Sequence, residues 1–244
     1  IIKNFENGKN KNLEYLLYKR FSWMNNFIKD SDIGLEVGSG AGLSKKFIKN
    51  ENLKTSDFSE HQHLDIKNID AQKTKFESNT FDFILASNML HHIPYPIKFF
   101  RETNRILKKG GRLIIFDAYC SVSLQLITIL MRHEGFDFTV DPWSETKPVT
   151  DENNVWSGNI AVTNLIFDNV PLFKKKIGDL YTIEHEKITE CMIFLNSGGV
   201  CSSTFYIPLN ESIIKIIDKF DTFLTRNFPN IFALGRQIVL KKIS

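Results

Sequence analysis

The chain is 244 residues long, and 42% of the residues are hydrophobic and 24% charged, a composition typical of one large globular domain with a full core. Lys and Arg number 31 against 28 Asp and Glu. The longest basic run is 174–176, so the chain lacks the electrostatic footprint that nucleic-acid binding needs, and a nucleic-acid partner is disfavoured.

Cysteines and apolar runs narrow the class further. Cys120, Cys191 and Cys201 form no close pair and show no metal-type spacing, so we expect buried thiols in a reducing compartment, without a zinc site. The longest apolar stretch, 124–131, is far short of the ~20 residues that span a bilayer. The first residues show no secretory pattern, and we expect a cytoplasmic protein from which some native N-terminal residues are missing.

The predicted elements alternate between strands and helices. Apolar and aromatic residues at helical spacing predict an N-terminal helix over 13–28. From 33 to 117, short apolar runs alternate with helical patterns, which indicates crossover units on a parallel sheet. The first two strands are expected at 33–37 and 54–58, and a third is expected to end near Asp70. The fourth and fifth are expected at 81–87 and 112–117, with helices at 42–50 and 97–107. Later elements are expected as helices at 121–132, 159–167 and 212–225 and a closing strand at 233–242.

Glycines recur at positions 38, 40 and 42, directly after the first predicted strand. Such a turn needs glycine because its dihedral angles oppose a Cβ atom and because the backbone must approach a ligand closely. The dehydrogenase fingerprint places its third glycine three residues after the second, where this chain has Leu43. The spacing therefore argues against NAD.

Two acidic residues flank this loop. Glu36 ends the first strand, where a carboxylate can face the cationic amine of an amino-acid ligand, which favours S-adenosylmethionine (SAM) over a dinucleotide. The alternative is a solvated strand-end carboxylate. Asp57 ends the second strand, where a carboxylate can accept two ribose hydroxyls, although alone it would serve equally as a helix cap.

With these features in order, the segment 34–117 resembles the methyltransferase domain of the class I SAM-dependent family. Asp70-Ala71 matches the acidic position that contacts adenine, residues 87–93 match the segment that lines cofactor and substrate, and 105–113 match the helix and turn before the fifth strand. One departure is 73–75, where the family usually has a Leu-Pro pair.

The resemblance implies a doubly wound, mostly parallel, seven-stranded α/β sheet with an inserted helical lid. It implies a single methyltransferase domain over 1–244, with a helical cover at 1–30 and an insertion at 118–175 that forms the acceptor side. It also implies SAM as cofactor and S-adenosylhomocysteine as product. The implied cofactor-binding residues are Glu36, Gly38, Ser39, Gly40, Gly42, Asp57, Phe58, Asp70, Ala71, Ser87, Asn88 and Met89.

Three histidines are candidates for the chemistry. Methyl transfer from a sulfonium is an in-line displacement that depends on positioning, but an alcohol acceptor must also lose a proton to a base such as histidine. His92 matches the position where the family most often has a histidine and is our first candidate, with His91 second. Both could instead pack on the cofactor or cap the turn before Pro94. His133 belongs to a polar cluster in the expected acceptor region.

The identity of the methyl acceptor is the aspect of the function that the sequence constrains least. Residues 132–138 and 195–200 resemble a subgroup of bacterial methyltransferases found with surface-polysaccharide biosynthesis, which implies O-methylation of a sugar or of a nucleotide- or lipid-linked glycan. Alternatives are a catalytically degenerate SAM-fold binding subunit, an NAD-dependent enzyme, and an acceptor of lipid or quinone type. Amino-nitrogen acceptors are disfavoured because 87–90 lacks an Asn-Pro-Pro-Tyr type signature. No metal ion is expected at the site.

Overall fold

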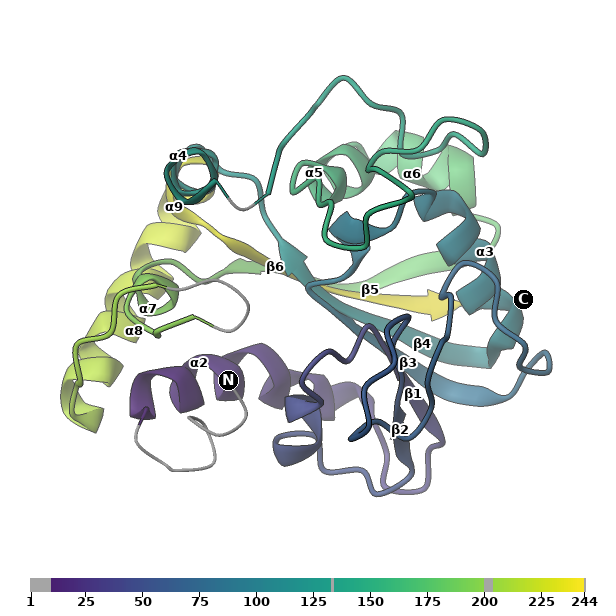
Figure 1. Cartoon of the computed structure of the whole chain (residues 1–244), viewed down its shortest axis with the longest axis horizontal. Helices are drawn as coiled ribbons and strands as arrows, with labels where there is room; N and C mark the ends of the chain where they lie inside the picture. The colour runs from purple at the N-terminus through teal and green to yellow at the C-terminus, as the bar shows by residue number, and fades with distance from the viewer. Residues whose placement is uncertain (1–9, 133, 200–203, 244) are drawn as a thin grey trace.

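A six-stranded sheet in the order β2-β1-β3-β4-β6-β5 forms the centre of the computed structural model, which describes residues 10–132, 134–199 and 204–243 (Figure 1). Neighbouring strands from β2 to β4 are parallel, and β6 is antiparallel to both β4 and β5. The mostly parallel α/β fold predicted from the sequence is confirmed. The strands are β1 Gly34–Val37, β2 Leu53–Thr55, β3 Phe81–Ser87, β4 Leu107–Ala118, β5 Tyr181–Thr189 and β6 Gly235–Lys242.

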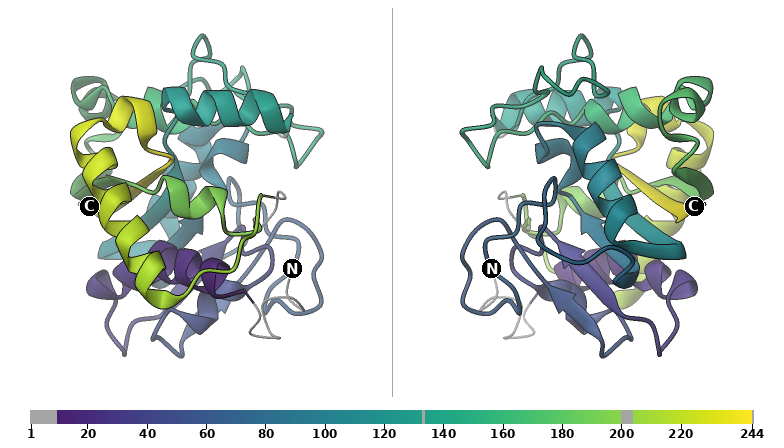
Figure 2. Two further views of the ribbon diagram at one scale, coloured as in Figure 1. Left: turned by 90° about the vertical axis from the view of Figure 1, so that its left-hand side faces the viewer. Right: turned by 90° about the vertical axis from the view of Figure 1, so that its right-hand side faces the viewer.

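Helices cover both faces of the sheet (Figures 1 and 2). On one face lie α2 Lys11–Phe21, η1 Ser22–Phe27, α7 Met192–Leu195 and α8 Glu211–Asn227. On the other lie α3 Pro96–Ile106, α5 Val162–Phe167 and α6 Val170–Ile177. Beyond the carboxyl end of β4, α4 Val122–Met131 packs against α9 Pro229–Phe232. Short 3-10 turns are η2 Leu43–Lys46 and η3 Leu90–His92.

Two apolar cores result from the alternation of side chains along each strand. In β3, Ile84 and Ala86 are buried with the helices α3, α5 and α6, whereas Phe83 and Leu85 are buried with α2 and η1. Because a strand covered on both faces is apolar where it is buried, the centre of β3, 83–86, is a continuous hydrophobic run, whereas Asp82 and Ser87 lie near its ends. The N-terminal helix predicted over 13–28 is thus part of the second core.

Several predicted elements differ in the structure. The third strand, expected to end near Asp70, is reduced to an isolated parallel bridge between Ser56 and Ile66, so the described sheet has six strands rather than seven. The helix expected over 42–50 is only the 3-10 turn η2, because the Asn25 amide donates to the Phe47 carbonyl and accepts from the Lys49 amide. The elements β5, α6, α7 and α9 were not predicted.

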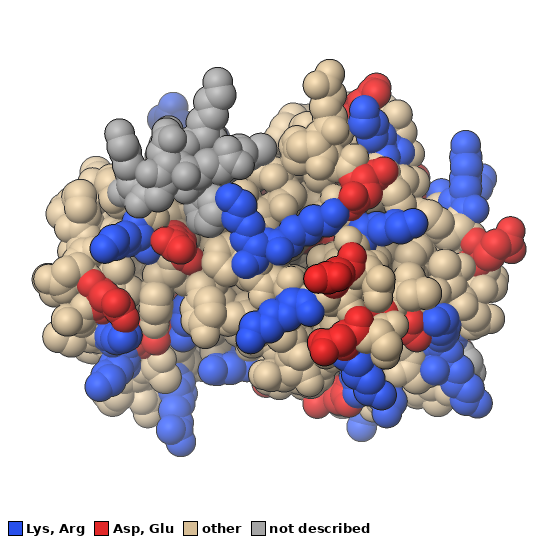
Figure 3. Space-filling view, turned by 90° about the horizontal axis from the view of Figure 1, so that it is seen from below, with Lys and Arg blue, Asp and Glu red and all other residues tan. Residues whose placement is uncertain are grey.

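Charges on the surface are mixed. On the face seen in Figure 3, basic and acidic side chains are interspersed and form no large patch of one sign. Within the described ranges, no helix has the length and apolar character needed to span a bilayer.

Candidate active site

A cavity of about 650 Å³ lies at the carboxyl ends of β1 and β3, the place where the strand order reverses. Open α/β sheets bind ligands at such a switch point, and the volume suits a ligand of nucleoside size beside a small second molecule. The N-terminal helix, the glycine loop, η3 and α4 all contribute to its wall. It therefore joins the expected cofactor region to the expected acceptor region.

The glycine loop has the backbone that its sequence predicts. Gly38, Gly40 and Gly42 have φ angles of 67°, 50° and 66°, a region that side chains oppose. A Cβ atom on Gly38 would also lie 2.8 Å from the Cβ atom of Met89. Asp57 holds the loop in this conformation, because its Oδ2 accepts a hydrogen bond from the Gly40 amide at 2.9 Å.

Glu36 is buried, with only 2% of its surface exposed, so the alternative of a solvated carboxylate is wrong. Its Oε2 accepts the Ser44 hydroxyl at 2.5 Å. Burial raises the pKa of Glu36 to about 7, against the opposing effect of hydrogen bonds from Ser44 and Ser39. The carboxylate faces the cavity and lacks a cation as a direct partner among its described hydrogen bonds, which fits a ligand that brings one.

The segment beyond β2 places further residues near the loop. The Ile69 amide donates to the Asp57 carbonyl at 2.9 Å, which brings Asp70 beside the end of β2. Both carboxylates also hold local turns, since Asp57 accepts the Ser59 amide and Asp70 accepts the Gln72 amide. His63, which no sequence pattern indicated, also contacts the loop, since its Nε2 lies 2.9 Å from the Gly40 carbonyl oxygen.

His91 is buried at the opposite side of the cavity, with 4% of its surface exposed. Its Nδ1 is hydrogen-bonded to Asp117, a buried residue of β4 that also accepts the Leu90 and Ala118 amides. Burial opposes a charge on this ring, but Asp117 and Glu134 outweigh it and raise the pKa of His91 to about 10. Asp117 thereby fixes both the orientation of the ring and its Nδ1 proton.

His92 lies beside His91, with ring centroids 4.2 Å apart. Its Nδ1 is 3.1 Å from the Ser157 carbonyl oxygen, which can only accept, so Nδ1 carries a proton and Nε2 keeps its lone pair in the neutral ring. Burial and the neighbouring charge of His91 lower the pKa of His92. The ring that was our first candidate for a base is thus held as a neutral acceptor.

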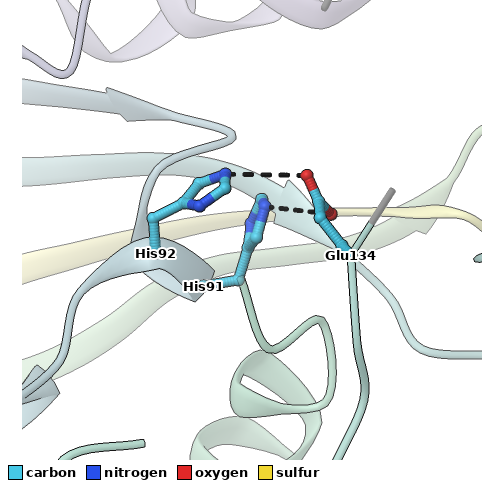
Figure 4. A group of neighbouring side chains, drawn as sticks. All are labelled: His91, His92 and Glu134. Carbon is cyan, nitrogen blue, oxygen red and sulfur yellow. Dashed lines mark ion pairs between the residues drawn. The ribbon is translucent and has the colours of Figure 1, made fainter. Parts of the chain in front are cut away.

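Glu134 completes this group (Figure 4). The sequence placed it in the polar cluster 132–134 of the expected acceptor region but indicated no role of its own for it. Its carboxylate oxygens lie 3.5 Å from His91 Nε2 and 3.7 Å from His92 Nε2. A parallel bridge between Gly135 and Asn159 holds the segment, and the Asn159 amide donates to the His91 carbonyl at 2.9 Å. A Cβ atom on Gly158 would lie 3.1–3.2 Å from all three side chains, so a glycine there lets the loop close on them.

A buried ion pair between Arg20 and Glu190 forms another part of the cavity wall that the sequence did not reveal. Arg20 comes from α2 and lies between the rings of Phe116 and Phe194, with its Cζ 5.3 and 5.5 Å from their centroids. Glu190 follows β5 and has a φ of 65°, which is strained for a residue with a side chain. The pair ties the N-terminal helix to the end of the sheet.

The structure brings together most, but not all, of the predicted site residues. Those that line the cavity are Glu36, Gly38, Ser39, Gly40, Ser87, Asn88, His91 and His92. Those that lie outside its lining are Gly42, Asp57, Phe58, Asp70, Ala71 and Met89. Phe58 is 58% exposed and Ala71 is buried in the core. His133 lies outside the described residues. The neighbouring Arg132 ends α4 in a left-handed conformation, as a C-terminal cap.

The fold and the loop together define a nucleotide-type binding site of the doubly wound α/β class. A family model described as a methyltransferase domain matches residues 35–115. The uncharacterized protein YafE of Escherichia coli (strain K12) is 32% identical over 148 residues, which cover 58% of this chain and 68% of YafE. The sterol 4-C-methyltransferase strm-1 of Caenorhabditis elegans is 44% identical over 48 residues, only 20% of this chain and 14% of that enzyme.

Solved structures agree in fold. A SAM-dependent methyltransferase from Archaeoglobus fulgidus has a TM-score of 0.52 at 16% identity, covering 93% of this chain and 94% of that one. A SAM-dependent methyltransferase from Methanosarcina mazei has a TM-score of 0.51 at 16% identity, covering 91% and 98%. The chain belongs to the class I SAM-dependent methyltransferase family, and its cofactor is SAM. The buried Glu36 carboxylate and the open backbone at Gly40, where a Cβ atom would meet nothing, fit that cofactor.

Proposed function

We propose that this methyltransferase transfers the methyl group to a hydroxyl of a small molecule. The observation that carries the proposal is the polar group of His91, His92 and Glu134, which shares one cavity with Glu36 and the glycine loop. A hydroxyl is a weak nucleophile until it loses its proton, so an O-methyltransferase needs a proton acceptor at this end of its site.

The proton has a defined destination in this arrangement. SAM would supply a methyl group bound to a sulfonium. The leaving group is then the neutral thioether of S-adenosylhomocysteine, which needs no acid to assist its departure. As the acceptor oxygen forms its bond to the methyl carbon, the electron pair of the carbon–sulfur bond goes to sulfur. The hydroxyl proton moves to His92 Nε2, the nitrogen left without a proton when Nδ1 donates to Ser157. His91, held by Asp117, positions Glu134 beside it.

The acceptor end of the cavity is also apolar. Leu124, Ile127 and Met131 of α4 contribute to its wall together with Phe194 and Trp156. Such a wall favours an acceptor that carries a hydrophobic part near its hydroxyl. This supports a lipid-linked sugar, within our prediction of a glycan intermediate of surface-polysaccharide biosynthesis, and it equally supports the alternative of a lipid- or quinone-type acceptor.

An assay for S-adenosylhomocysteine release tests the proposal. We would compare nucleotide sugars, lipid-linked sugars and quinols, each paired with an analogue in which an amine replaces the hydroxyl. Turnover is expected with hydroxyl compounds, and more of it with those that carry an apolar chain. Turnover confined to the amines would contradict O-methylation, and turnover confined to free nucleotide sugars would contradict the apolar acceptor.

A further inference from the structure

Two imidazoles and one carboxylate converge at the acceptor end of the cavity (Figure 4). His91 and His92 are consecutive in η3, and Glu134 follows α4. One ligand atom from each of the three side chains lies within 4.8 Å of the others. The distances from Glu134 to the two Nε2 atoms are 3.5 and 3.7 Å. A single ion with bonds of about 2.1 Å reaches two atoms up to about 4.2 Å apart, so the two distances from Glu134 are within its range. Closing the whole group, whose ligand atoms lie within 4.8 Å of one another, onto one ion takes a movement of at most about 0.6 Å.

Each imidazole is already oriented as a metal ligand is. A histidine that binds a metal through one nitrogen generally donates the other N–H to a carboxylate or a carbonyl. His91 Nδ1 is bonded to the Asp117 carboxylate, and His92 Nδ1 to the Ser157 carbonyl. Both Nε2 atoms are therefore directed toward Glu134. The groups that hold the two Nδ1 atoms come from β4 and from the insertion, so two separate parts of the fold fix the orientation of the rings.

His91 Nε2 is also left without a hydrogen bond. It is buried, and apart from the 3.5 Å ion pair with Glu134 it has no hydrogen-bond partner among the described residues. Buried polar atoms almost always have a hydrogen-bond partner. An exception in the wall of a cavity points to a group that binds in that cavity. An ion bound here would displace the proton from His91 Nε2, and the two carboxylates around the rings, Asp117 and Glu134, would then balance its charge.

We propose that His91, His92 and Glu134 bind one divalent transition-metal ion, such as Zn²⁺, Co²⁺ or Mn²⁺. Two imidazoles and one carboxylate suit these ions, whereas Mg²⁺ and Ca²⁺ prefer oxygen ligands alone. The sequence did not predict this site, because Glu134 lies 42 positions after His92 in the chain. Three protein ligands leave positions open toward the cavity. If the proposed O-methylation holds, an ion there would polarise the acceptor hydroxyl and take over the role given to His92.

The test is a titration of chelator-treated protein with Co²⁺ alone, followed by its visible absorption, and with Zn²⁺ alone, followed by calorimetry. One equivalent is expected to bind. Glu134→Gln and His92→Gln should each weaken binding at least ~10-fold. Matched controls are Glu145→Gln, an exposed residue paired with Arg101, and His185→Gln, which stacks on Trp23 outside the cavity. Both should bind as the wild type does.

Either of two results would overturn the metal site: no stoichiometric binding, or equal binding by the wild type and the two ligand variants. X-ray absorption of the Zn²⁺-loaded wild type adds a readout that needs no variant, and a ligand shell containing sulfur would also overturn it. The proposed function fails separately. Absence of S-adenosylhomocysteine release with every hydroxyl compound would contradict O-methylation while leaving the metal titration unaffected.

Discussion

Glu36 is the single residue whose burial at the cavity carries the clearest expected cost to the ligand-free fold, a cost that a bound cation would offset. The carboxylate is buried, and burial raises its pKa to about 7. We expect Glu36→Gln to weaken SAM binding by about 10–100-fold, because a charge-assisted hydrogen bond to the amino group of the cofactor would be lost. Calorimetry measures this directly. Ser44→Ala, which removes a hydroxyl bonded to the same carboxylate, is expected to have a smaller effect.

The same residue predicts a dependence on pH. The groups that face Glu36 are the hydroxyls of Ser44 and Ser39, with Asp57 and Lys45 further away. Its folded pKa of about 7 exceeds the ordinary value of 4.5, so the folded chain binds more protons between these pH values, and the free energy of unfolding falls as pH rises across that window. Glu36→Gln should therefore be more stable than the wild type above pH 7, by an amount on the order of 3 kcal/mol.

Chemical unfolding at pH 5 and pH 8 checks this prediction. The difference in stability between Glu36→Gln and the wild type should be larger at pH 8. SAM affinity of the wild type should fall as pH decreases through about 7, because the protonated carboxyl no longer attracts a cation, whereas the affinity of the variant should vary less. An identical pH profile for both proteins would contradict the assignment of Glu36.

His92 is the residue on which the chemistry depends in our proposal. Replacement of His92 by Ala should lower turnover at least ~100-fold with SAM affinity retained, the lower end of the contribution of a general base. His185→Gln is the control, because that ring packs against Trp23 and Phe27, away from the cavity. Turnover like that of the wild type in His92→Ala would remove His92 from the mechanism, whether as base or as metal ligand.

The sequence located residues of the cavity wall where one short segment carries the signal. The glycine loop, Glu36 and the histidine pair are each adjacent to a strand whose apolar run is easy to recognise. It failed for Glu134 and for the Arg20–Glu190 pair, because those contacts join segments far apart in the chain. No local sequence pattern identifies a residue whose partners lie in a distant segment, because its position depends on how the insertion folds.

At the scale of elements, the insertion between α4 and α5 is held by few regular hydrogen bonds and relies on Asn159. Its Oδ1 accepts the Asp137 and Ala161 amides, and its Nδ2 donates to the Asp137 and Val149 carbonyls. Asn159→Ala leaves these backbone groups without partners, and we expect a loss of about 2–4 kcal/mol in the free energy of unfolding. Urea unfolding measures it.

Asn154→Ala is the matched control in the same insertion. Asn154 is exposed and, among the residues that the structure describes, its side chain accepts the Trp156 amide alone, so its loss should cost less than about 1 kcal/mol. Because Asn159 also pairs with the segment that carries Glu134, turnover should fall in Asn159→Ala but not in the control. Equal stability of the two variants would show that the insertion is held in another way.

The elements that the sequence predicted poorly share a physical cause. Strand β5 is an edge strand whose exposed positions carry charges, such as Glu184 in its ion pair with Arg112, so its apolar alternation is weak. The segment after β2 is polar, and the Asp65 carboxylate binds the backbone and hydroxyl of Thr55. The Asp65 side chain thus occupies the edge of β2 with which a third strand would pair. The hydrophobic periodicity of the sequence carries no information about such a side-chain contact.

At the scale of the whole molecule, the cavity is assembled from the N-terminal helix, both halves of the sheet and the insertion, so a ligand in it stabilises all of them together. S-adenosylhomocysteine at a hundred times its dissociation constant should add about 2.7 kcal/mol to the free energy of unfolding. For a chain of this length, the expected rise in melting temperature is about 5–10 °C. NAD should give no rise, because the glycine spacing and the buried Glu36 both oppose a dinucleotide.

Differential scanning fluorimetry with S-adenosylhomocysteine and with NAD measures the shift in melting temperature. Glu36→Gln should reduce the rise caused by S-adenosylhomocysteine. A rise with NAD equal to that with S-adenosylhomocysteine would contradict the selectivity of the site. The shift alone does not separate an enzyme from a degenerate binding subunit, since both would bind the cofactor. Product release with a hydroxyl acceptor separates them, because in our proposal it requires the group of His91, His92 and Glu134 to take up the acceptor proton.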